Sequence, residues 1–108
     1  MKIKEGLEEK YAKYISNPDG APLDEYAQEI VNTAERVGAA LDEGKTPEEA
    51  HEQVKGHGLT GYMVGHAMMM VVDFNPRGDE MRGWWNKFCG GTGDEKGTIN
   101  PAIVTLRD

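Results

Sequence analysis

GLTGYMVGHAMMMVVDF, residues Gly58 to Phe74, is the longest strongly apolar stretch of the chain. Its apolar residues recur at helical spacing and also fill most of the other directions around a helix. A helix that is apolar nearly all round is buried by neighbours on several sides. The stretch is shorter than the roughly 20 apolar residues of a membrane span, and His66 lies in its middle. It therefore predicts a central helix over about residues 59–74 of a small soluble domain.

The sequence on both sides predicts further helices that surround the central one. Gly44 follows an apolar stripe at the position where a glycine often ends a helix. Thr46, Pro47 and Glu49 form the pattern of a capping box that begins the next helix. Asn75-Pro76 breaks the central helix, because the residue before a proline disfavours helical geometry. The additional helices are expected at residues 2–15, 23–43, 47–55 and 76–88.

The C-terminal segment differs from the helical part. Residues 90–98 are rich in glycine and predict a flexible loop, and residues 99–108 predict an extended arm or a short strand. A lone strand has no partner within the chain, so the arm either packs over the helices or pairs with its copy in a dimer. The expected fold is mainly α, a single domain over residues 1–108 with four to five helices around a central buried helix.

Composition narrows the classes of function. The chain has 108 residues, 38% of them hydrophobic, and a net charge of −7. An acidic surface is repelled by phosphate backbones, so nucleic-acid binding is not expected. A single cysteine excludes an internal disulfide and indicates a reducing compartment, and the N-terminus lacks the apolar run of a signal peptide. We expect a cytoplasmic protein whose small core is completed by self-association, as a homodimer.

The adjacent tryptophans Trp84 and Trp85 indicate an interaction surface. They point about 100° apart on a helix, so one can enter the core beside Met81 while the other is half-buried; the stripe of Met81, Trp84 and Phe88 places Trp85 on the flank. Tryptophan and arginine together are enriched at binding hot spots. The competing interpretation is that both tryptophans pack inside the domain. The residues expected at a dimer or partner interface are Arg82, Trp84, Trp85, Phe88, Ile103 and Leu106.

A second candidate site lies at the turn that leads into the central helix. Backbone N–H groups at a helix N-terminus attract anions, and His57, Thr60, Tyr62 and His66 would supply polar groups. The methionines of the central helix could line a small-molecule pocket between helices, although core packing is the better explanation of them. Residues 56–61 do not match the phosphate-loop pattern. A tight turn between two helices explains them without any ligand.

The sequence gives less support to a metal site or a catalytic site. His51, His57 and His66 could converge, but no paired ligand motif accompanies them. The acids Glu48, Glu49 and Glu52 resemble the acidic helix starts of metal-dependent helical nucleotide hydrolases. Only Asp73 or Glu80 could supply the acids of a second helix, and the capping box already explains Glu49. We expect no cofactor, and an enzyme is the weaker alternative.

Three segments carry a resemblance: HGLTGYMVGHAMMMVV at residues 57–72, RGDEMRGWWN at residues 77–86 and NPAIVTL at residues 100–106. Together they resemble small bacterial proteins of prophages and integron gene cassettes. The resemblance implies a mobile element as the source and gives no mechanism. The expected function is a small interaction or accessory protein that self-associates, and the alternative is a small-molecule or anion-binding protein.

Overall fold

A computed structural model describes residues 1–16, 25–55 and 61–88, with the side chains of Gly61 and Tyr62 excepted. The expected loop at 90–98, the arm at 99–108, and His57 and Thr60 lie outside the described residues. Five helices follow one another along the described chain: α1 (Glu8–Ser16), α2 (Glu25–Asp42), α3 (Pro47–Glu52), α4 (Gly61–Phe74) and α5 (Gly78–Phe88). The predicted mainly helical fold is confirmed.

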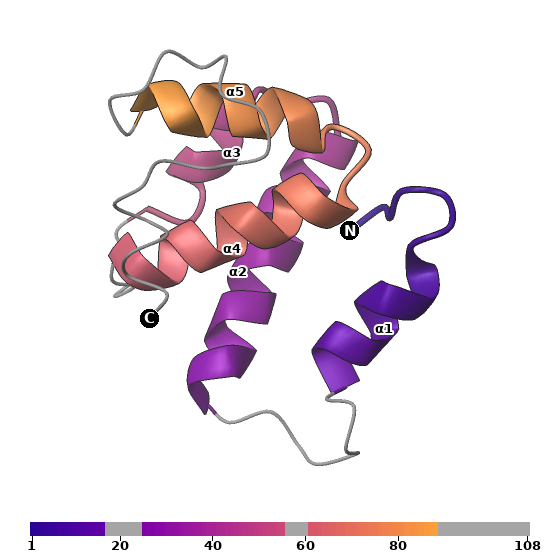
Figure 1. The fold of residues 1–108 in the computed structure, drawn as a ribbon. Coiled ribbons are helices and arrows are strands. Elements are labelled where there is room, and N and C mark those ends of the chain that lie inside the picture. The colour runs from indigo at the N-terminus through magenta and orange to yellow at the C-terminus, as the bar shows by residue number, and fades with distance from the viewer. Residues whose placement is uncertain (17–24, 56–60, 89–108) are drawn as a thin grey trace.

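The central position of α4 is also confirmed. It packs against α2 on one side and α5 on another, and the short α3 lies between α2 and α5 (Figure 1). Ala67, Met68 and Val71 of α4 are fully buried. The apolar residues on different sides of α4 therefore face different neighbouring helices, as a helix that is apolar all round requires. From the other helices the core receives Ala34, Val37, Leu41, Ala50 and Met81.

Helix α2 ends at the glycine that the sequence indicates. Gly44 has a φ of 93°, its N–H donates to Leu41 O, and the N–H of Lys45 donates to Ala40 O. These two bonds make a Schellman motif. Arg77 also binds backbone carbonyls at this end of α2. Its Nη1 donates to Leu41 O and Lys45 O at 2.7 Å each. Nε and Nη2 of the same guanidinium donate to the two carboxylate oxygens of Glu80, which makes a bidentate ion pair.

The first seven residues do not extend α1 as the sequence predicts. Gly6 adopts a φ of 86°, and residues 1–4 instead run across the ends of α2 and α4. The N–H of Lys4 donates to Phe74 O at 2.7 Å, and the N-terminal ammonium contacts Glu35 at 2.9 Å. Residues 1–4 therefore form an extended strap, and its backbone bond from Lys4 to Phe74 takes the place of a helical bond.

Asn75 ties three segments together at the turn between α4 and α5. Its buried amide donates to Asp42 Oδ1 at 3.1 Å and to Lys2 O at 3.4 Å, and its Oδ1 accepts from the N–H of Arg77. The predicted break after Asn75 is confirmed. Helix α5 begins at Gly78 rather than at Pro76, because the Asn75 side chain bonds a turn that precedes the helix.

Candidate functional site

The candidate site begins with the local structure of α3. Thr46 Oγ1 accepts from the N–H of Glu49 at 3.1 Å, and Glu49 Oε1 accepts from the N–H of Thr46 at 3.0 Å. The predicted capping box is thus confirmed. The hydrogen bonds to Thr46 lower the pKa of the Glu49 carboxyl, so it stays ionised in this role. The box fixes the start of a six-residue helix, and this orients His51 toward α5.

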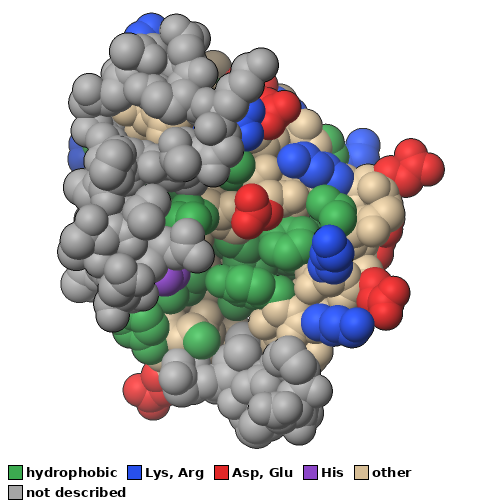
Figure 2. Space-filling view, in the orientation of Figure 1, with side chains coloured by type: hydrophobic (Ala, Val, Ile, Leu, Met, Phe, Trp, Pro, Cys, Tyr) green, Lys and Arg blue, Asp and Glu red, His purple; other side chains and the backbone are tan. Residues whose placement is uncertain are grey.

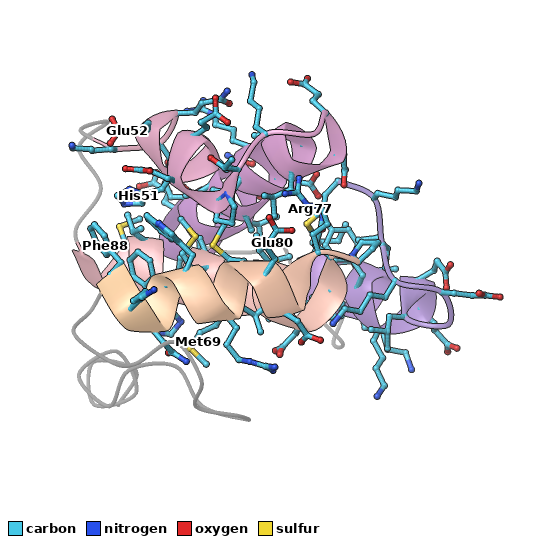
Figure 3. The ribbon with its side chains drawn as sticks, turned by 90° about the horizontal axis from the view of Figure 1, so that it is seen from above. His51, Glu52, Met69, Arg77, Glu80 and Phe88 are labelled. Carbon is cyan, nitrogen blue, oxygen red and sulfur yellow. The ribbon has the colours of Figure 1, made fainter. Side chains whose placement is uncertain are left out.

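An aromatic cluster joins α3 to α5. The ring of His51 lies 5.0 Å from that of Phe88, 5.3 Å from Trp84 and 5.7 Å from Trp85, measured between centroids. Phe88 stacks on Trp84 with centroids 5.0 Å apart and an interplanar angle of 22°. Figure 3 shows His51 and Phe88 facing each other at one end of α5, away from the Arg77–Glu80 pair. Four rings from two helices therefore form one contiguous surface.

The rings of His51, Trp84 and Phe88 form the floor of an open groove of about 280 Å³. The α3–α5 groove, as we name it, is lined by Glu48, His51, Glu52, Lys55, Trp84, Lys87 and Phe88. Two acids and one lysine come from α3 and the turn after it, and the other lysine comes from α5. Phe88 keeps 57% of its surface exposed although it stacks on its neighbours. An apolar floor with charged edges is the usual anatomy of a protein interaction surface.

His51 is a buried titratable residue in the lining of the α3–α5 groove. Only 8% of its surface is exposed, and this burial lowers the pKa of its imidazole; the charge of Glu52 opposes the shift and that of Lys55 adds to it. His51 is consequently neutral at pH 7, and the groove floor carries no charge.

The two tryptophans exchange the roles that the sequence predicts. Trp85, expected on the half-buried flank, is 4% exposed and belongs to the core, whereas Trp84 is partly exposed and lines the groove. Phe88, which the sequence places in the helical stripe and among the expected interface residues, is exposed. Both α4 and α3 pack against α5, and this packing buries Met81 and Trp85 while it leaves Trp84 partly exposed and Phe88 exposed. The spacing of residues along α5 does not specify which of its sides these neighbours cover.

The other expected interface residues have separate positions. Arg82 pairs with Asp79 on the same helix at 3.1 Å and does not line the α3–α5 groove. Ile103 and Leu106 lie outside the described residues. Sequence reasoning missed His51 as a member of this surface, although its place three residues before Val54 and one after Ala50 on the apolar side of α3 was a usable signal.

His66 lies outside the α3–α5 groove. With Tyr14, Met69, Met70, Asp73 and Phe74 it lines a pocket of about 150 Å³ between α1 and α4. Figure 2 shows hydrophobic side chains gathered across this face of the molecule, bordered by charged ones. His51 and His66 therefore belong to two separate sites and do not converge. Of the predicted turn site, the structure describes only this histidine, because the Tyr62 side chain, His57 and Thr60 are outside the described part.

Two further properties bear on function. Within residues 1–16, 25–55 and 61–88, no three histidine, cysteine, aspartate or glutamate side chains gather closely enough to hold a metal ion. Among the helices described here, none combines the length and apolarity needed to cross a bilayer. No family model, curated protein or solved structure matches this chain significantly.

Proposed function

We propose that this protein is a small helical interaction protein that forms a homodimer through the α3–α5 groove. The observation that carries the proposal is Phe88, a large apolar side chain exposed by 57% at the centre of an aromatic surface. Beside it, Trp84 is partly exposed and is of the residue type most enriched at hot spots. Origin in a mobile element, and action there as a cytoplasmic accessory factor, stay predictions from the sequence.

The physical case rests on what a second protein would gain at this surface. Covering Phe88 and Trp84 removes apolar area from water at roughly 25 cal/mol per Å². Their rings are already stacked on each other and both contact the tilted ring of His51, so little side-chain entropy is lost on binding. Trp84 and Phe88 therefore fit the role of a preorganised anchor, and the charged residues at the edges fit that of a rim.

The test compares two substitutions of exposed aromatic residues. Phe88→Ser should shift the dimer–monomer equilibrium toward monomer by at least tenfold in Kd, measured by light scattering over a concentration series. Tyr26→Ser is the matched control, because Tyr26 is also exposed, by 44%, but lies on α2 outside the groove. Equal dissociation constants for the wild type and both variants would contradict the proposal.

The pocket at His66 supports a second candidate function, the binding of a small molecule. Its volume of about 150 Å³ is below the roughly 300–1,000 Å³ of drug-sized pockets, so it suits a ligand of few atoms. His66→Phe should keep the fold and remove any rise in Tm that a small anion or metabolite causes. A broad ligand screen that produces no such rise in the wild type would count against this function.

A further inference from the structure

We propose that two copies of the chain meet across their α3–α5 grooves about a two-fold axis, with Glu48 of each copy facing Lys87 of the other. This inference rests on the proposed self-association and specifies its geometry. The axis would pass near the exposed ring of Phe88, so that the aromatic floors of the two grooves cover each other. The occupant of the groove is thus a second copy of this chain.

The charges of the groove carry the argument. Its lining holds two acids and two lysines, and His51 is neutral, so the groove as a whole is uncharged while the chain carries −7. Glu52 and Lys55 already form an ion pair with each other at 3.3 Å. In the described part of the chain, Glu48 and Lys87 form no ion pair, and both are exposed. One unpaired acid on α3 and one unpaired base on α5 therefore border the same apolar floor.

A two-fold axis makes such a surface complementary to itself. In an isologous interface residue i of one copy contacts residue j of the other, and j contacts i. A patch with one charge sign would repel its own copy, whereas an acid on one edge and a base on the other create two equivalent attractive contacts. Rim charges of this kind select the partner and its orientation more than they add affinity. The aromatic floor supplies the affinity.

The experiment exchanges the charges in separate chains. Lys87→Glu places two like-charged contacts in its homodimer, and Glu48→Lys does the same with opposite sign, so each variant should dimerise at least about tenfold more weakly than the wild type. A mixture of the two restores both attractive contacts in the heterodimer. With one variant labelled with ¹⁵N, native mass spectrometry of the 1:1 mixture should show mainly heterodimer.

Controls separate this geometry from general effects of charge and folding. Lys10→Glu and Glu5→Lys make the same charge changes at exposed positions outside the groove, and should neither weaken dimerisation tenfold nor prefer each other in a mixture. Circular dichroism reports whether each variant is folded. If Glu48→Lys does not fold, Lys87→Glu is compared with Lys87→Gln, and the acidic variant should be the weaker dimer.

The outcomes distinguish the two proposals. A wild-type dimer whose charge variants show no preference for the heterodimer overturns this geometry and leaves self-association intact. A dimer in which Lys87→Glu and Lys87→Gln are equally strong does the same. A wild type that stays monomeric overturns both.

Discussion

Gly78 shows how a single residue fixes the angle between two helices. A Cβ built at this position would lie 2.1 Å from the carbonyl oxygen of Val72 and 2.8 Å from its carbonyl carbon. Backbone atoms at this distance cannot give way as a side chain can, so the chain folds back from α4 into α5 only with glycine there. The sequence shows Gly78 as a cost to helix propensity, whereas the structure shows it as a requirement of packing.

We therefore expect Gly78→Ala to destabilise the protein, although alanine is the better helix former by about 1 kcal/mol. The shift of α5 that relieves the contact should cost about 1–3 kcal/mol, as in other overpacked sites. Asp79→Ala, at the next and exposed position, should change the free energy of unfolding by less than about 0.5 kcal/mol. Urea denaturation measures both, and a Gly78→Ala protein as stable as the wild type would contradict the account.

His51 gives a pH dependence with a definite sign. Burial lowers its pKa in the folded protein, whereas in the unfolded chain it titrates near its ordinary value of about 6.5. Between the two values the unfolded state binds more protons, so stability rises with pH there. The contribution of His51 is complete above about pH 6.5 and is lost as the pH falls toward the lowered pKa.

The check is the free energy of unfolding from pH 7.5 to 5, compared between the wild type and His51→Phe. The phenyl ring keeps an aromatic group among Trp84, Trp85 and Phe88 but does not titrate. The wild type should lose more stability than the variant on acidification, because the two proteins differ in no other side chain. Parallel curves would show that His51 is not desolvated as described.

At the scale of the helix, α5 shows what a sequence pattern leaves open. The stripe of Met81, Trp84 and Phe88 is a correct helical spacing, and Met81 is fully buried. The spacing does not specify from which side the neighbours come, and Trp85 lies only about 100° from Trp84. Both α4 and α3 pack against α5, and in this packing Trp85 is buried while Trp84 stays partly exposed.

The two tryptophans should accordingly respond differently to substitution. Trp85→Ala removes a buried ring and should cost about 3–5 kcal/mol of stability, enough to unfold much of a domain of this size. Trp84→Ala should keep the helical signal and weaken self-association instead. Circular dichroism on heating, with light scattering on the folded variant, measures both effects. Unfolding by Trp84→Ala together with a stable Trp85→Ala protein would reverse the assignment.

For the molecule as a whole, local signals in the sequence predicted most of the helical fold. The apolar run of α4, the glycine that ends α2 and the capping box of α3 each act within a few residues, so their outcome follows from the sequence. The strap at residues 1–4 and the place of His51 beside Trp84 and Phe88 did not follow, because both depend on distant contacts. Lys4 bonds Phe74 across 70 positions, and His51 meets Phe88 only once α3 and α5 are packed.

The surroundings of His66, the second candidate site, likewise depend on contacts between residues that are distant in the sequence. The sequence groups His66 with residues of the preceding turn and helix start, whose side chains lie outside the described part. The structure adds Tyr14 of α1 to the surroundings of His66, and no local pattern indicates that residue. Periodicity assigns a residue to a face of its own helix. Which helix covers that face is set by the connections and by polar ties such as Asn75 to Asp42 and Lys2.

The measurement that tests the central claim most directly is the solution mass of the wild-type protein over a range of concentrations. One chain has a mass of 11.9 kDa. If the α3–α5 groove is a self-association surface, the weight-average mass rises with concentration from this value and levels off at twice it. A mass that stays at 11.9 kDa up to millimolar concentration would contradict the claim that the exposed aromatic surface is completed by a second copy.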